Sequence, residues 1–481
     1  MNGVNFNSSS IFEKNNQTIE FYGAVGDGLT DDSSAWNTAL DNEDILYLSS
    51  KTYKIDRTIG LKSNKKIIGQ FGTILKFGDI QDTTCIRGTN VSNLYLENII
   101  FDFDIQTELK YGLSLFTSDN FEFKNCIFKN GYGYSVRLND SCHDFKITNC
   151  KFLDIKGASS NPGGAIVGNN FYNVEISGCY CNNLYDHFLY VDGSTESYNI
   201  NVHDCVLVNT GSDPGTDVTA GYAICFYSIV HHSILNNLII QNCKSGIFLG
   251  IHGSNLTVPY QNSISNVIIN NVNLSGITLT GSSTYPVRDI QIDGLIIGNS
   301  NQDGLIFRYA ENIKLTNSYI SSCVRNALEL SGVNYSIFNE LSFVNTKRLA
   351  MYLGYYENQT SNNNLFSNLL ISPDSQSETL LYGIYLRRGS YNKFNNVTVK
   401  SGFPEDCDVT IVSPDNTFLN LDCDSCRSNT IYFETNITSS HKVFNIGDIK
   451  VNPSATSGDT VISMCTTSGN PGSWTSILKM P

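Results

Sequence analysis

The sequence has few charged residues and no long apolar run. Of its 481 residues only 16% are charged while 41% are hydrophobic, so the chain can bury a large core and disorder is not expected. No stretch approaches the roughly 18 apolar residues of a membrane-spanning helix, so a membrane protein is not indicated. The first 16 residues are polar and lack the charged segment and apolar run of a secretory signal, so conventional secretion is not expected.

Positive charge is also scarce. The 31 Lys and Arg residues are outnumbered by 45 Asp and Glu, which gives a net charge of -14. Binding to a phosphate backbone requires a cationic footprint, so a nucleic-acid partner is not expected. A strongly anionic ligand would need a local basic patch.

The 14 cysteines are thinly spread, and five of them occupy the same slot of a repeated phrase. Equivalent slots of stacked coils lie about 4.8 Å apart. We therefore expect a column of free, buried thiols that pack as small apolar residues, and no metal site. The five are Cys126, Cys150, Cys179, Cys205 and Cys243, and the first four of them should form the column.

From Asn93 to about Ser401 the chain repeats itself roughly every 23 to 30 residues. Each repeat holds two strand-like phrases, one ending in Cys and one with the pattern Gly-apolar-x-apolar-x. Strand-only repeats of this length are typical of a parallel β-helix, and the hand should be right because parallel crossovers almost always are. Copies of the second phrase run over 112–116, 133–137, 164–168, 188–192, 246–250, 304–308 and 383–387.

The predicted fold class is all-β: a right-handed parallel β-helix, or single-stranded solenoid, with an N-terminal capping helix and a small C-terminal β element. The helix should span Asp32 to Leu40, with Trp36 on its apolar face, and should close one end of the solenoid. A polar loop at 210–218 lengthens one coil, a place where solenoids often bind ligands. The expected parts are 1–44 (entry strand and helix), 45–400 (β-helix) and 401–481 (C-terminal β region).

The segment Tyr22–Asp32 (YGAVGDGLTDD) resembles the entry motif of the pectate-lyase-like β-helix superfamily, which is frequent in bacteriophage tailspikes and capsule depolymerases. The segment Cys465–Trp474 looks like a short tail found in phage appendage proteins. The aspartates of the entry motif should form turns and cap the helix. They are Asp27, Asp31 and Asp32.

The resemblance implies a homotrimer on the phage tail that binds and cuts polysaccharide on the host cell surface. Phage tail or baseplate proteins would be its partners, and the C-terminal region would be associated with the trimer. No virion-attachment domain precedes the repeats, so we expect either a short spike or part of a longer protein. The polygalacturonase signatures are absent, so that family's catalytic residues are not transferred.

Alternate residues of a strand face opposite sides, so the second phrase should place side chains in two outward columns. Aromatic rings among charges would suit a carbohydrate platform, but they could equally pack beneath loops or between subunits. The first column is Ser114, Ser135, Tyr190, Cys225, Phe248, Ile306, Glu329, Tyr352 and Tyr385. The second is Phe116, Arg137, Asp192, Tyr227, Thr280, Arg308, Ser331 and Arg387.

Glycoside hydrolysis needs two carboxyl groups about 5 to 9.5 Å apart. The favoured cluster brings Asp186, His187, Tyr190 and Asp192 beside the long loop, with Asp192 as acid or nucleophile. Its partner would be Asp213 or Asp217. Calcium bound by such loop carboxylates is a further option, and no other cofactor is expected.

A second cluster joins Asp303 and Arg308 to Glu329 on the next coil. It suits elimination from a uronate, with Arg308 or the pair Arg387 and Arg388 holding the carboxylate and a Tyr or His as base. The predicted function is thus a depolymerase acting on capsule or O-antigen, by hydrolysis in preference to elimination. An adhesin that holds glycan without cutting it, or a cellular polysaccharide-active enzyme, are the alternatives.

Overall fold

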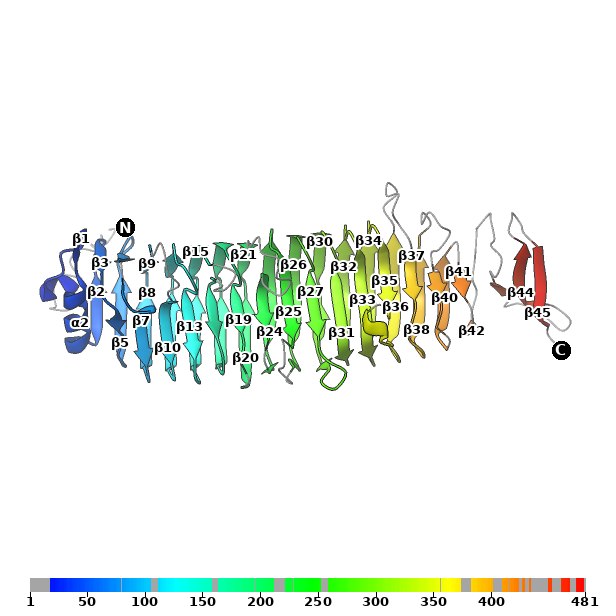
Figure 1. Cartoon of the computed structure of the whole chain (residues 1–481), viewed down its shortest axis with the longest axis horizontal. Coiled ribbons are helices and arrows are strands. Elements are labelled where there is room, and N and C mark those ends of the chain that lie inside the picture. Colours follow the sequence, from blue (N-terminus) through cyan, green and yellow to red (C-terminus); the bar gives the residue numbers. More distant parts are fainter. Residues whose placement is uncertain are drawn as a thin grey trace, which may run out of the picture. The chain divides into compact units, whose positions relative to one another are not determined.

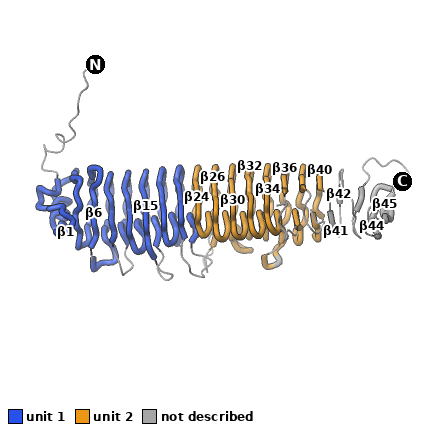
Figure 2. Tube along the Cα trace, turned by 90° about the horizontal axis from the view of Figure 1, so that it is seen from above, with its two compact units in different colours: residues 1–225 blue, residues 226–481 orange. Residues whose placement is uncertain are grey.

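The computed structural model describes residues 18–78, 80–104, 111–157, 163–193, 195–211, 221–227, 229–251, 258–354, 356–372, 382–400, 409–413 and 415–423, and the backbone of the strands between 426 and 479. It divides into two compact units, residues 1–225 and 226–481 (Figure 2). In the described part of the chain almost every element is a β-strand (Figure 1). No helix there is long and apolar enough to cross a membrane.

The α-helix α2 (Ser33–Asn42) lies at the start of unit 1, next to the first coils (Figure 1). Its predicted apolar face is buried, and Trp36 is only 1% exposed. Asp32 occupies the N-cap position but its carboxylate does not cap the helix; it accepts hydrogen bonds from the backbone N–H of Val25 (2.7 Å) and Gly26 (3.1 Å). The entry motif is therefore a folded turn, as predicted, preceded by the 3-10 helix η1 (Ile19–Tyr22).

Unit 1 is a stack of coils whose strands pair in parallel with the next coil. Irregular coils come first, with β1 (Asp27–Asp31), β2 (Ile45–Leu48), β3 (Thr52–Ile55) and β4 (Ile59–Gly60). One row of strands is β7 (Thr84–Thr89), β10 (Tyr111–Phe116), β13 (Val136–Asn139), β16 (Ile166–Gly168), β19 (Leu189–Val191) and β22 (Tyr222–Phe226). A second is β5 (Lys65–Gly69), β8 (Ser92–Glu97), β11 (Asp119–Lys124), β14 (His143–Thr148), β17 (Tyr172–Ser177) and β20 (Ser197–His203). A third is β6 (Ile74–Phe77), β9 (Ile100–Asp102), β12 (Ile127–Lys129), β15 (Lys151–Ile155), β18 (Tyr180–Leu184) and β21 (Val206–Thr210).

Unit 2 repeats this architecture. One row holds β25 (Ser245–Gly250), β27 (Ile277–Thr280), β31 (Leu305–Glu311), β33 (Asn326–Asn334), β35 (Leu349–Leu353), β37 (Tyr382–Leu386), β39 (Val409–Ile411) and β41 (Cys426–Ser428). The other holds β24 (Ile234–Gln241), β26 (Ser263–Val272), β29 (Gln291–Asp293), β30 (Ile296–Ser300), β32 (Lys314–Ser321), β34 (Ile337–Val344), β36 (Leu365–Ser372), β38 (Lys393–Val399), β40 (Thr417–Cys423) and β42 (Tyr432–Phe433). Short strands are β23 (Val230–His231) and β28 (Val287–Arg288), and η2 (Tyr356–Asn358) is a 3-10 helix.

Parallel pairing continues past residue 400, because β38 pairs with β40 in register. The expected boundary at 400 thus falls inside the parallel coils. Beyond them, β43 (Ile449–Val451), β44 (Thr460–Thr467) and β45 (Ser473–Lys479) form an antiparallel sheet. A separate C-terminal β element is therefore present, as predicted.

Equivalent side chains stack inside the coils. In unit 1 the rings of Phe128 and Phe152 lie 5.1 Å apart, and the thiols of Cys126, Cys150 and Cys179 are free and buried in one column. Burial is the largest cause that raises the pKa of the Cys150 thiol well above its ordinary value, so this thiol stays protonated. The predicted thiol column is confirmed, and it is a packing feature.

Asparagine ladders hold the bends between strands. In unit 2, Asn392 is fully buried; its amide donates to the carbonyl of Ser361 (2.9 Å) and to Oδ1 of Asn416 (2.9 Å), and its Oδ1 accepts from the backbone N–H (3.0 Å) and side-chain amide (2.9 Å) of Asn364. The amide N–H₂ and the Oδ1 of Asn392 are therefore both hydrogen-bonded. Its side chain satisfies buried polar groups that water cannot reach.

Replacing Asn392 with Ala should cost about 3 kcal/mol of unfolding free energy, because it leaves several buried polar groups unsatisfied. The thermal midpoint at a fixed scan rate measures this. Asn396→Gly is the matched control, since Asn396 donates to Asn368 (3.1 Å) in an exposed ladder and has a positive φ of 52° that Gly adopts freely. Equal losses in the two variants would contradict the role of burial.

Candidate functional site

Unit 1 contains the favoured cluster around Asp186 and His187, which lead into β19. Both side chains are buried, with Oδ1 of Asp186 lying 3.2 Å from Nε2 of His187. The same oxygen accepts from the backbone N–H of Gly221 (2.9 Å), and Oδ2 accepts from the Tyr134 hydroxyl (3.3 Å). Burial first, and then the charge of Asp186, raises the pKa of Tyr134 well above its ordinary value. Asp186 thus anchors a buried hydrogen-bond network.

Asp192 lies at the end of β19 and is half-buried, so unlike Asp186 it reaches the surface. Its carboxylate accepts from the hydroxyl of Tyr190 (2.9 Å) and from the backbone N–H of Gly193 (2.7 Å). Burial, followed by the charge of Asp192, raises the pKa of Tyr190, which keeps this hydroxyl a donor. The Tyr190 ring stacks on His187 with centroids 4.9 Å apart, so the buried pair fixes the tyrosine that holds Asp192.

The predicted column that placed Arg137 with Asp192 is wrong. Arg137 pairs with Ser114 and Val167, and Val167 pairs with Tyr190, so Arg137 lies in the row of Tyr190. The glycine that opens this copy of the phrase, Gly133, has a φ of 115° and belongs to a turn, so the strand begins later than the repeat suggested.

Arg137 stacks over aromatic rings of the preceding strand, 4.4 Å from the centroid of Tyr111 and 5.4 Å from that of Phe116. Asp213 and Asp217, the predicted partners of Asp192, lie outside the described residues.

Unit 2 contains the second cluster, centred on an ion pair between Arg308 on β31 and Glu329 on β33. Nε and Nη2 of Arg308 lie 2.9 and 2.8 Å from Oε1 of Glu329. The Glu329 side chain is fully buried, whereas that of Arg308 is 23% exposed. The buried carboxylate therefore presents a guanidinium at the surface.

Asp303, the third member, is also fully buried. Its Oδ1 accepts from the backbone N–H of Asn326 (3.1 Å), and its Oδ2 lies 3.5 Å from Nη1 of Arg325. Burial raises the pKa of Asp303 to about 6; Arg325 opposes this shift and the charge of Glu329 adds to it. Neither Asp303 nor Glu329 is open to solvent, so Arg308 is the member of this cluster that a ligand would meet.

Asp303 should make stability fall as the pH rises from about 4 to about 6. In this window the unfolded chain has lost the proton while the folded chain keeps it, and the shift from 3.8 to about 6 corresponds to roughly 3 kcal/mol. Thermal midpoints of the wild type and Asp303→Asn across this range measure the effect. The variant should lose less stability than the wild type as the pH rises, and parallel curves would contradict the assignment.

The half-buried Tyr356 and the exposed Glu357 flank Arg308. Its guanidinium lies 4.2 Å from the centroid of the Tyr356 ring, in η2. The neighbouring Glu357 accepts a hydrogen bond of 2.5 Å from the hydroxyl of Tyr309, the residue after Arg308. Burial and then this bond raise the pKa of Tyr309 to about 12.

Tyrosines continue this face on the next strands. Glu329 pairs in register with Tyr352, and Tyr352 with Tyr385, as the first column predicted. The Tyr385 ring stacks on Tyr382 (centroids 4.9 Å apart), and Nη1 of the exposed Arg387 donates to the Tyr352 hydroxyl (3.4 Å). We name the accessible members the tyrosine–arginine surface; it comprises Arg308, Tyr356, Tyr382, Tyr385 and Arg387.

Three aromatic residues that were predicted to bind substrate are buried and are not part of an exposed surface. Tyr227 and Phe248 are 3% and 7% exposed, and their rings pack together with centroids 4.5 Å apart. Tyr352, at 5%, likewise packs beneath Tyr385 and Arg387 and does not offer a face. Fewer of the predicted rings are therefore open to a ligand than expected.

Several residues of the two clusters were not predicted from the sequence. Tyr134 and Arg325 lie next to repeat phrases, but only the fold brings them to Asp186 and Asp303. The segment Tyr356–Asn358 falls between repeats, and its extra length after Gly354 was an available signal. Among the described residues no group of three or more His, Cys, Asp or Glu could hold a metal.

Comparisons with known proteins agree with this architecture. A family model described as right handed beta helix region matches residues 85–259 and 256–404. A pre-neck appendage protein of Bacillus phage B103 is 26% identical over 262 residues, 52% of this chain and 28% of that protein. A capsule K30/K69-specific depolymerase of Klebsiella phage K64-1 is 24% identical over 304 residues, 55% of this chain and 35% of that protein. The chain thus spans only about a third of the length of these relatives.

Two solved structures share the fold. A family 28 exopolygalacturonase of Yersinia enterocolitica has a TM-score of 0.51 at 11% identity, over 74% of this chain and 77% of that one. The pre-mature gene product 12 of bacteriophage phi29 has a TM-score of 0.50 at 14% identity, over 90% of this chain and 57% of that one. The expected resemblance to phage appendage and depolymerase proteins is confirmed. Since the family model covers more than half of the chain, the protein belongs to the right handed beta helix region family, as its repeats predicted.

Proposed function

We propose that this chain is the β-helical part of a phage tail appendage that binds and cleaves a bacterial surface polysaccharide, either capsule or O-antigen. Its relatives include phage appendage proteins and a capsule depolymerase, and its fold is shared with a polygalacturonase. The protein would belong to the virion, contact tail or baseplate proteins and assemble as a homotrimer. Sedimentation equilibrium of the purified chain tests the trimer.

The tyrosine–arginine surface is the observation that carries the binding part of the proposal. Tyrosine rings can pack on the faces of sugars, and guanidinium groups can form bidentate hydrogen bonds to carboxylates. Arg308 to Arg387 spans four consecutive strands of one sheet, roughly 14 Å at the usual strand spacing. Such a row suits an extended glycan with acidic substituents.

For cleavage, exposure favours the unit 1 cluster. Asp192 reaches the surface with an oriented carboxylate, whereas Asp303 and Glu329 are fully buried. We assign Asp192 as the acid or nucleophile of a hydrolase, and Tyr190, His187 and Asp186 as the residues that position it. The second carboxyl group would come from the 210–218 loop, through Asp213 or Asp217.

Elimination at the unit 2 cluster is the second candidate, because Arg308 could hold a uronate carboxylate beside Tyr309 and Tyr356. Elimination also needs a base that accepts a proton from the sugar, and the nearby tyrosines do not suit this role. The pKa of Tyr309 is raised to about 12 and that of Tyr356 is also raised, chiefly by its hydrogen bond to Glu357. Both hydroxyls are therefore protonated at neutral pH and suit binding better than proton abstraction.

Incubating the protein with capsule or O-antigen from susceptible bacteria tests the function. Shortened oligosaccharides with saturated ends support hydrolysis, and unsaturated ends would show elimination. Retention of polysaccharide without shortening would show an adhesin. Absence of both binding and shortening with every polysaccharide tested would overturn the proposal.

Arg387→Ala and Tyr385→Ala should each weaken polysaccharide binding by up to about tenfold, because each removes a contact worth about 1.4 kcal/mol or less. Surface plasmon resonance on immobilised polysaccharide measures the change. Tyr319→Ala removes an exposed tyrosine of β32, on the other row of strands of unit 2, and should leave binding unchanged. Equal effects in all three variants would rule out a specific role for the surface.

A further inference from the structure

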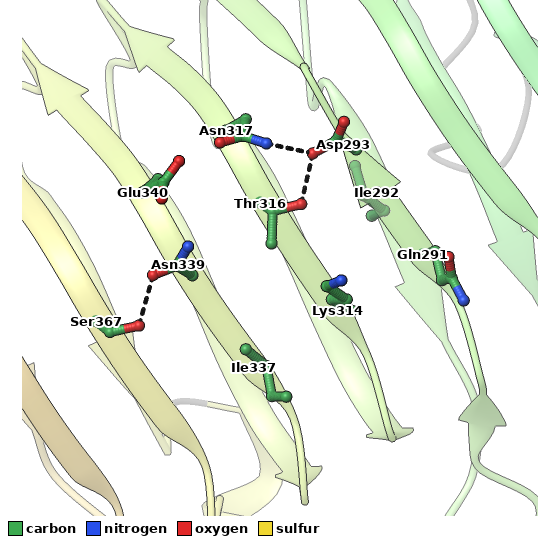
Figure 3. Close-up of a pocket in the computed structure, with 10 residues that line it drawn as sticks. All are labelled: Gln291, Ile292, Asp293, Lys314, Thr316, Asn317, Ile337, Asn339, Glu340 and Ser367. Atoms are coloured by element: carbon green, nitrogen blue, oxygen red, sulfur yellow. Dashed lines mark hydrogen bonds between the residues drawn. The ribbon is translucent and has the colours of Figure 1, made fainter.

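Unit 2 carries a groove on a different row of strands from the tyrosine–arginine surface. It has a volume of about 520 Å³ and lies across β29, β32, β34 and β36 (Figure 3). Pockets that hold small ligands have volumes of about 300 to 1,000 Å³. The lining is Gln291, Ile292, Asp293, Lys314, Thr316, Asn317, Ile337, Asn339, Glu340 and Ser367.

Glu340 interrupts a ladder at this groove. The equivalent bend positions of the coils have positive φ, and apart from Gly294 and Glu340 each carries Asn; they are Asn237, Asn266, Gly294, Asn317, Glu340, Asn368, Asn396 and Asn420. The Asn317 amide donates to Oδ1 of Asp293 (2.7 Å), and the Asn368 amide donates to Oδ1 of Asn339 (3.0 Å). A carboxylate has no N–H to donate. The hydrogen bond that an asparagine at position 340 would donate to the preceding coil is therefore missing from the ladder.

The break leaves polar groups facing the groove. Figure 3 shows two separate sets of hydrogen-bonded residues in the groove. In one, Asp293 accepts from Thr316 and Asn317; in the other, Asn339 accepts from Ser367. Within the described residues, no partner is found for the Asn339 amide N–H₂, the Glu340 carboxylate or the Lys314 ammonium. Both donors and acceptors thus line the cavity, which suits a ligand whose hydroxyl groups can do both.

The charges of the groove and its apolar side chain indicate which class of ligand fits. Two carboxylates, Asp293 and Glu340, outweigh the ammonium of Lys314, so an anionic sugar would be repelled. Ile337 is 41% exposed and offers an apolar patch for the C–H face of a sugar ring. Glu at a positive φ (55°) is less favourable than the Asn of neighbouring coils, and such local strain recurs at functional sites.

We propose that this groove is a second glycan-binding site, one that takes an uncharged, hydroxyl-rich stretch of polysaccharide. It rests on the proposed function, because it assigns a further site to the same polysaccharide-binding chain. The two sites divide the recognition: the tyrosine–arginine surface takes acidic sugars and the groove takes neutral ones.

A printed array of neutral and acidic bacterial polysaccharides tests the site, with Glu340→Asn as the main variant. Asn restores the missing rung toward Asn317 and removes the carboxylate, so we expect a higher thermal midpoint together with at least tenfold weaker binding of neutral polysaccharides. Lys314→Ala should also weaken neutral binding. Asp415→Asn removes a carboxylate from another left-handed bend (φ 61°) outside the groove and should change neither binding class.

Unchanged neutral binding by Glu340→Asn and Lys314→Ala would overturn the groove while leaving the proposed function intact. Loss of acidic binding alone in these variants would also overturn it, because the charge argument would have the wrong sign. A wild-type protein that retains no polysaccharide on the array would overturn the proposed function and the groove together.

Discussion

Replacing Asp192 with Asn should reduce polysaccharide cleavage at least 100-fold while leaving binding nearly unchanged. The amide can still accept from the backbone N–H of Gly193, so the geometry at the end of β19 should persist. It can neither attack a sugar carbon nor transfer a proton, and such groups typically contribute 10² to 10⁴ in rate. Reducing-end release from the cleaved polysaccharide measures turnover, and surface plasmon resonance measures binding.

Two further variants test whether cleavage depends on Asp192 or on the unit 2 cluster. Tyr190→Phe removes one hydrogen bond to Asp192 and should reduce turnover less than Asp192→Asn, since the carboxylate remains. Glu329→Gln alters the unit 2 cluster and should affect binding through Arg308 with little effect on turnover. Undiminished turnover in Asp192→Asn, or a larger loss in Glu329→Gln, would exclude the unit 1 cluster as the cleavage centre.

The fold was predictable because its signal is periodic. Cys126, Cys150 and Cys179 recur at one slot, and stacked coils are the arrangement that buries such slots together. Register was predicted correctly where the strand begins no later than the second residue of the phrase, as β19 does after Phe188 and β31 after Gly304. At Gly133 a turn intervenes and β13 begins only at Val136, so Arg137 was placed in the wrong column.

The candidate sites were predictable as clusters but not as surfaces. Asp303, Arg308 and Glu329 were expected together and do lie together, since their coils are neighbours. Exposure could not be read from alternation, because an outward side chain is buried wherever its neighbours cover it. Glu329 is covered by Arg308, and Tyr352 is covered by Tyr385. In both cases the covering side chain comes from a neighbouring coil.

Arg308→Leu should destabilise the protein by about 3 to 5 kcal/mol, because it leaves the fully buried carboxylate of Glu329 without its countercharge. The partial exposure of Arg308 does not soften this cost, since Glu329 has no access to water. Urea unfolding followed by tryptophan fluorescence and far-UV circular dichroism measures the loss. Arg387→Leu is the control: Arg387 is exposed and contacts a tyrosine hydroxyl, so its removal should cost under about 1 kcal/mol.

The double variant Arg308→Leu with Glu329→Leu decides what the pair is for. If the pair were retained for stability, losing both charges would cost as much as losing one. Desolvation makes buried pairs poor stabilisers, so the double variant should recover most of the loss. It should still bind acidic polysaccharide at least tenfold more weakly, because the guanidinium that Glu329 holds at the surface is gone. A stable double variant with intact binding would contradict the role of Arg308 in recognition.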